Sequence, residues 1–159
     1  MAMEIYALSN RRLTSMAEWQ RAIDLEQFPF PLTLSVSTPF AQLHGFLPVQ
    51  YEKARTGFEC DHWDPRSVIA EYPDIDLGRR WKFALAFRFG GRPGELESAW
   101  MAAASYTRAT CGVLFDTEER RVFEPNDAAQ LIRKIESNRP LRAAMDEAIK
   151  RKLFPQKQS

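Results

Sequence analysis

The segment Lys82–Phe89 alternates between large apolar side chains and small or charged ones. Its four large residues occupy the odd positions 83, 85, 87 and 89, and therefore share one face of a strand. Alanines and Arg88 occupy the other face. Burial of four such side chains can contribute about 1.5–3 kcal/mol each, so the pattern predicts a strand with one face on a hydrophobic core.

The remaining chain predicts further strands and helices that do not alternate strictly. Strands are predicted at 3–8, 32–36, 56–60, 113–115 and 122–123, and helices at 15–27 and 95–110. Gly112 is expected to form a left-handed C-cap, Asn126 to cap a further helix, and Pro140 to begin a last helix that ends near Leu153. This order favours an α+β fold, with a mixed, mostly antiparallel sheet, helices packed on one face and C-terminal helices.

Composition is typical of one globular domain that spans residues 1–159. The chain has 22 basic and 21 acidic residues, a net charge of +1, so a dedicated nucleic-acid interface is not expected. No apolar run is long enough to cross a membrane, and Met1–Tyr6 lacks the pattern of a secretory signal. We therefore expect a cytoplasmic protein with reduced cysteines. The basic segment at about 139–159 is interpreted as a solvated helix and tail.

The densest group of polar side chains lies at Glu59–Asp64. Cys60 and His62 are two residues apart, so a strand would place them on one face. They are the candidates for a small hydrolase-like enzyme, but a nucleophile also needs an orienting third group, and none is evident. Two cysteines and two histidines are few ligands for zinc, and the nearby aspartates lack the spacing of a calcium loop. We predict no catalytic residue, no metal and no cofactor.

The loop Gly90–Gly94 follows a strand and precedes a helix, as phosphate-binding loops do. It has neither the dinucleotide-binding spacing nor a Gly-Lys-Ser/Thr ending, and Pro93 removes one donor amide. A small-molecule pocket beside the alanine face of Phe83–Phe89 remains an alternative.

Trp63 lies among carboxylates, as an aromatic anchor with a charged surround does in many protein interfaces. We therefore predict that this acidic segment binds a protein partner. The predicted partner-binding residues are Glu59, Asp61, His62, Trp63, Asp64, Asp74 and Asp76.

The segments Tyr106–Asp116 and Phe123–Ala129 form an alanine-rich helix, a Gly-Val-x-x-Asp strand, a charged turn and a capped helix. This arrangement resembles the C-terminal part of small bacterial immunity proteins that neutralise secreted toxins. The resemblance covers about a quarter of the chain. It implies a protein that is not an enzyme and blocks a toxin domain by covering its active site, and it carries over no catalytic residue. A homo-oligomer is left open.

Overall fold

The computed structural model describes residues 2–36, 38–137, 147–149 and 151–152. Seven strands form one sheet in the order β2-β3-β4-β5-β1-β6-β7. The strands are β1 (Met3–Ser9), β2 (Leu32–Leu34), β3 (Phe46–Tyr51), β4 (Ala54–Trp63), β5 (Phe83–Phe89), β6 (Val113–Asp116) and β7 (Arg121–Phe123). The helices are α1 (Met16–Glu26), α2 (Pro65–Glu71), α3 (Glu95–Thr110) and α4 (Pro125–Ser137), with a 3-10 turn, η1 (Phe40–Gln42). The α+β fold is therefore confirmed, and every ladder is antiparallel.

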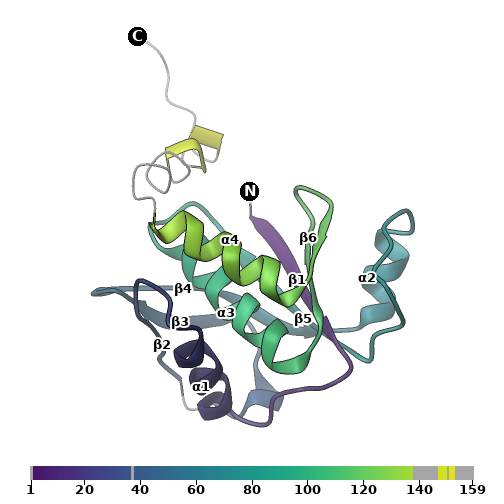
Figure 1. Ribbon diagram of the computed structural model, residues 1–159, viewed down its shortest axis with the longest axis horizontal. Helices are drawn as coiled ribbons and strands as arrows, with labels where there is room; N and C mark the ends of the chain where they lie inside the picture. Colours follow the sequence, from purple (N-terminus) through teal and green to yellow (C-terminus); the bar gives the residue numbers. More distant parts are fainter. Residues whose placement is uncertain (1, 37, 138–146, 150, 153–159) are drawn as a thin grey trace.

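Helices α1, α3 and α4 cover one face of the sheet (Figure 1). The odd-numbered side chains of β5 point into this layer, as the alternation predicts, and Leu85 and Phe87 are at most 1% exposed. Trp19 of α1 is fully buried at its centre, with its ring 6.0 Å from that of Phe87. Its indole nitrogen donates to the carbonyl of Ala102 at 3.0 Å, so the large side chain is both packed and satisfied.

The other face of the sheet is covered over only part of its width. Here α2 and the connection to β5 bring Val68, Leu77 and Trp81 against the even-numbered side chains Ala84 and Ala86. Small alanines let these elements approach the sheet closely. The outward side chains of β3 and β4 lie beyond this second cluster. We call this uncovered part the open face and define it by Phe46, Pro48, Gln50, Arg55, Gly57, Glu59, Asp61, Trp63 and Arg88.

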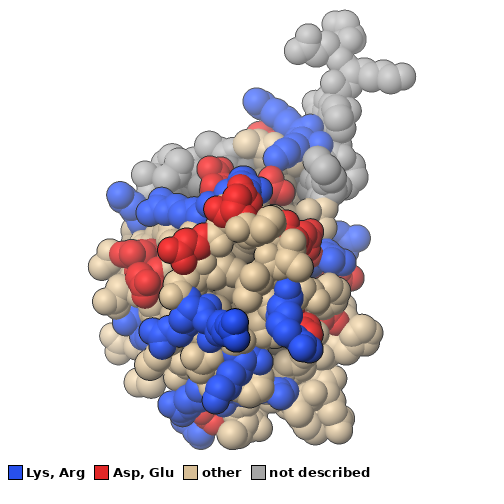
Figure 2. All heavy atoms as spheres, turned by 90° about the vertical axis from the view of Figure 1, so that its right-hand side faces the viewer, with Lys and Arg blue, Asp and Glu red and all other residues tan. Residues whose placement is uncertain are grey.

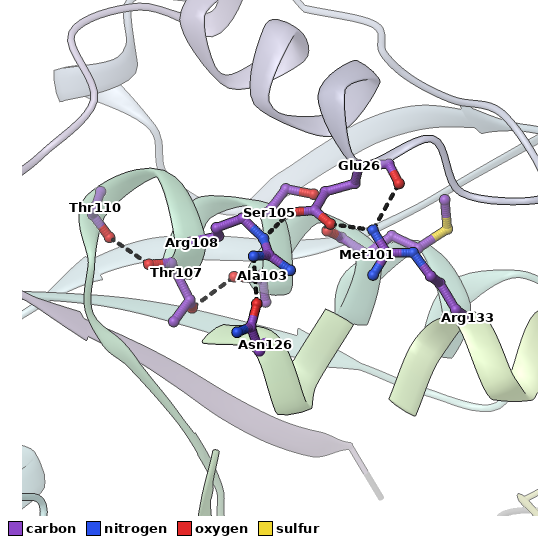
Figure 3. Close-up of polar contacts among 9 residues, drawn as sticks. All are labelled: Glu26, Met101, Ala103, Ser105, Thr107, Arg108, Thr110, Asn126 and Arg133. Carbon is purple, nitrogen blue, oxygen red and sulfur yellow. Dashed lines mark hydrogen bonds and ion pairs between the residues drawn. The ribbon is translucent and has the colours of Figure 1, made fainter. Parts of the chain in front are cut away.

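Helix α3 is buried on almost all sides, between the sheet, α1 and α4. Its alanines allow close packing. Its buried hydroxyls donate to carbonyls one turn earlier, Ser105 to Met101 and Thr107 to Ala103, both at 2.7 Å (Figure 3). Both hydroxyls are therefore satisfied within the helix itself.

The three helices of the covered face meet at Glu26, the last residue of α1 (Figure 3). The side chain of Glu26 is 4% exposed, and its carboxylate pairs with Arg108 of α3 and Arg133 of α4. Arg133 also donates to the main-chain oxygen of Glu26 at 2.7 Å. Because a buried carboxylate is tolerated only when it is paired, this cluster fixes the ends of three helices relative to one another.

Two predicted helix caps are wrong. Cys111, not Gly112, takes the left-handed conformation that ends α3, with φ of 57°. Position 112 needs a glycine for a different reason, the close approach of β1. A Cβ there would lie 2.1 Å from the carbonyl oxygen of Leu8. Helix α4 begins at Pro125, so Asn126 lies inside its first turn and accepts a hydrogen bond from Arg108.

Most of the predicted last helix, which starts at Pro140, and most of the basic segment at 139–159 lie outside the described residues; within that span, 147–149 and 151–152 are described and are helical. Within the described part of the chain, no helix is long and apolar enough to span a membrane.

Candidate functional site

The predicted partner-binding residues are divided between two parts of the structure. Strand β4 continues to Trp63, further than the predicted end at Cys60, because Asp61 and Trp63 continue its alternation toward solvent. The chain then enters α2, which begins at Pro65. The row of outward side chains on β4 therefore contains Glu59, Asp61 and Trp63, while Asp64 and later residues lie beyond the strand.

An acidic hollow of about 180 Å³ opens at the end of this row. It lies over Ala86, where the small side chain of β5 leaves space between the strands and α2. We call it the acidic hollow and define it by Glu4, Tyr6, Asp61, Trp63, Glu71, Ala86 and Arg88. Three of these residues are carboxylates and one is a cation, so its charge is negative.

Arg88 lies at the centre of the charges around the hollow. Its guanidinium is 2.8 Å from Glu4 and 3.7 Å from Glu59, and the hydrogen bond to Glu4 raises the pKa of Arg88. Tyr6 also donates to Glu4, and burial together with this carboxylate raises the pKa of the phenol. Tyr6 and Arg88 therefore both hold the carboxylate of Glu4 in place, and this fixes one wall of the hollow.

The other two carboxylates differ in how they are held. Asp61 accepts the amide of Gly45 at 2.9 Å and lies 2.6 Å from Nδ1 of His44, so it orders the turn before β3. The exposed side chain of Glu71, at the end of α2, forms no hydrogen bond or ion pair with any described residue. Glu71 is thus the carboxylate of the hollow that is most available to a bound group.

Two large aromatic side chains are exposed on the open face. Trp63 is 47% exposed at the rim of the acidic hollow, and Phe46 is 61% exposed on β3. Phe46 pairs across the ladder with Glu59, which pairs in turn with Arg88. Apolar surface of this kind among charged groups is typical of protein interfaces.

The other predicted binding residues have structural roles away from this face. The ring of His62 points to the covered face, where Nε2 donates to the carbonyl of Phe40 at 2.8 Å. Asp64 caps α2 by accepting from Arg66 N at 2.9 Å, and it also pairs with the Arg66 guanidinium. Asp74 pairs with Arg120, and Asp76 accepts the amide of Gly78.

The surface around α2 is consequently not uniformly acidic. Figure 2 shows this side of the molecule, where acidic side chains gather in the upper part next to several basic ones, and basic side chains predominate in the lower part. The basic residues of this stretch include Arg66, Arg79, Arg80 and Lys82, all of them exposed. Of the aspartates in the predicted segment, Asp61 lines the acidic hollow, whereas Asp64 and Asp74 are each paired with an arginine.

Cys60 and His62 share a face of β4, as expected, but their surroundings do not suit a nucleophile. Cys60 is fully buried, and desolvation raises the pKa of its thiol well above the ordinary value. A reactive cysteine needs the opposite shift and access to substrate. No hydrogen bond between Cys60 and His62 occurs in the described structure.

Beside Ala84, the alanine face of β5 is packed against Leu8, Trp81 and Val113. Ala86 borders the acidic hollow instead. Among the residues that the structure describes, no group of three or more His, Cys, Asp or Glu side chains is placed to hold a metal ion.

Several residues of the acidic hollow and the open face were missed from the sequence: Glu4, Tyr6, Phe46, Glu71 and Arg88. The alternation of β1 and β5 contains part of the signal, since Glu4, Tyr6 and Arg88 occupy their outward positions. Which outward positions stay uncovered depends on the path of α2, which the sequence does not reveal. Phe46 was obscured because Gly45 and Pro48 interrupt the pattern of its strand.

Comparison with family models, with curated proteins and with solved structures gives no match for this chain.

Proposed function

We propose that this chain is a protein-binding module of the immunity type, which neutralises a toxin domain by covering its active site with the open face. The observation that carries the proposal is the exposure of Trp63 at the rim of the acidic hollow, on a part of the sheet that none of the described helices covers. The proposal includes a cytoplasmic location and requires no cofactor.

The chemistry of this face supports a partner with a basic surface. Trp63 offers a large, stiff side chain for burial, and such residues dominate binding energies. Glu71 and the other carboxylates of the hollow would attract cationic groups and accelerate encounter. The active-site cleft of a nuclease has this character, since it must bind phosphates.

The test begins with isolation of the partner from the native lysate and its identification by mass spectrometry. Surface plasmon resonance then compares the wild-type chain with Trp63→Ala and with Leu25→Ala, a matched control on α1 whose side chain is 83% exposed. Trp63→Ala should weaken binding by about 2 kcal/mol or more, mainly through faster dissociation. Leu25→Ala should bind as the wild type does.

Inhibition of the partner is measured in the same series. The wild-type chain should abolish the toxic activity at a stoichiometric ratio. The proposal is wrong if the activity persists in the complex, or if Trp63→Ala binds with unchanged affinity while circular dichroism shows an intact fold.

A further inference from the structure

A groove of about 840 Å³ lies between the β3–β4 hairpin and the loop that joins β5 to α3. Its apolar lining includes Phe46, Pro48 and Gly57, and its cations are Arg55 and Arg92. We call it the arginine groove. It lies at the opposite end of the β4 row from the acidic hollow, so the two ends of the open face differ in charge.

The wall formed by the loop is held in place by its own polar contacts. One carboxylate oxygen of Glu95 accepts the amides of Gly90 and Arg92, each at 3.1 Å. Thr56 of β4 donates to the carbonyl of Pro93 at 3.3 Å, which joins the hairpin to the loop. The groove is therefore formed before anything binds, and its ordering costs little on association.

Within the apolar lining, Phe46 lies against Gly57. A Cβ at this position would lie 2.5 Å from Cζ of Phe46, so the Phe46 ring lies directly against the glycine backbone. The ring nevertheless remains 61% exposed. A side chain of a bound segment can therefore pack on Phe46 without displacing any part of this chain.

The two arginines of the groove differ from the paired arginines described above. Arg88, Arg108, Arg120 and Arg133 each pair with a carboxylate. Arg55 and Arg92 are exposed, and neither guanidinium pairs with a carboxylate among the described residues. Glu95, the acidic residue of the groove lining, already uses its carboxylate on the loop amides.

We propose that the arginine groove binds an extended acidic peptide segment of a partner protein, with carboxylates on Arg55 and Arg92 and an apolar side chain on Phe46. Guanidinium groups match carboxylates in geometry as well as in charge, which favours this occupant. The proposal does not depend on the partner being a toxin.

A nucleic acid fits the same arginines less well. A phosphate backbone that continued along the β4 row would next meet Glu59 and Asp61, and then the acidic hollow. A short acidic segment can end before these carboxylates. A polyanion of regular charge spacing cannot, so the surroundings favour a peptide.

The test uses two fluorescein-labelled peptides, Asp-Phe-Asp-Phe-Asp and its matched control Lys-Phe-Lys-Phe-Lys. Fluorescence anisotropy measures their binding to the wild-type chain, to the double variant R55Q/R92Q and to the control double variant R21Q/R80Q, which changes two exposed arginines elsewhere. The acidic peptide should bind saturably, with a Kd that R55Q/R92Q raises by about tenfold or more. R21Q/R80Q should leave the Kd unchanged, and amide NMR shifts should include Gly57 and Gly94.

Four results would overturn the proposal. In the first, binding of the acidic peptide does not reach saturation at protein concentrations up to about 1 mM, a range that includes weak peptide complexes. The lysine peptide binds as tightly as the acidic one. R55Q/R92Q, with a wild-type circular dichroism spectrum, binds with an unchanged Kd. A single-stranded oligonucleotide binds in an arginine-dependent way while the peptide does not, which would assign the groove to nucleic acid.

Discussion

The side-chain amide of Gln20 on α1 takes the place of a neighbouring strand at the outer edge of β2. Its Oε1 accepts from the backbone N–H of Leu34 at 2.8 Å, and its Nε2 donates to the carbonyl of Leu32 at 2.9 Å. Exposed strand edges are templates for pairing with other chains. Gln20 satisfies this edge from within the molecule, so the sheet cannot readily be extended at β2.

Gln20→Ala should open this edge. Loss of two hydrogen bonds worth about 0.5–1.5 kcal/mol each should lower the free energy of unfolding, and the Leu34 amide should lose protection from hydrogen exchange. Gln42→Ala, at an exposed position of η1, is the matched control and should leave this amide protected. Equal protection of Leu34 in the Gln20 variant would show that the side chain does not close the edge.

Leu85→Ala should destabilise the chain by about 2–5 kcal/mol, because it removes a large side chain that is 1% exposed in the covered face. Denaturant unfolding measures this change. Leu25→Ala is the control and should shift stability by no more than about 0.5 kcal/mol. A loss below about 1 kcal/mol at Leu85 would contradict the packing described for β5.

The two thiols should react very differently. A chromogenic disulfide reagent at neutral pH should modify only Cys111, which is exposed, and should modify Cys60 as well after unfolding in guanidinium. Rapid reaction of native Cys60 would restore the enzyme hypothesis.

The raised pKa of Cys60 also has a consequence for stability. The unfolded chain ionises this thiol near its ordinary value of 9.0, whereas the folded chain does not. Unfolding therefore releases a proton above that pH, and stability should fall as the pH rises. Cys60→Ser, followed by alkaline denaturant melts, should reduce this decline.

Glu71→Gln should mainly slow association with the partner and weaken its dependence on salt, because this carboxylate contributes charge to the acidic hollow without any pairing to a described residue. The dissociation rate should change little. Asp127→Asn, an exposed acid in the first turn of α4, is the control for overall charge. If the association rate of the wild type, of Glu71→Gln and of Asp127→Asn is the same at low and at high salt, the acidic hollow is not part of the interface.

The sequence was informative where one strand's own pattern decides the structure. The alternation of β5 identifies its core face, and the spacing of Cys60 and His62 places them on one face of β4. It failed where a distant segment decides. Gly112 has the residue type of a helix cap, yet it is required by the approach of the Leu8 carbonyl.

The candidate site was only partly predictable for the same reason. Trp63 and Asp61 were identified because they lie in one short segment, but Arg88 joins Glu4 only through the register of β1 and β5. Asp64 and Asp74 looked like members of an acidic patch, and each is instead neutralised by an arginine, one of them 46 residues away. The sequence of a segment shows which of its side chains are charged, but not which of them form ion pairs with residues elsewhere in the chain.

The tightly packed side chains and the exposed polar and aromatic side chains lie on opposite faces of the sheet, the covered face and the open face. Any change in α3 is felt by the sheet and by two helices at once, since nearly every side chain of this helix is buried. The outward side chains of Arg55, Glu59 and Trp63 are exposed, so residues at these three positions of β4 can be exchanged without refilling a core. The identity of these side chains is therefore nearly independent of the folding of the chain, because surface substitutions away from such contacts usually change stability by no more than about 0.5 kcal/mol.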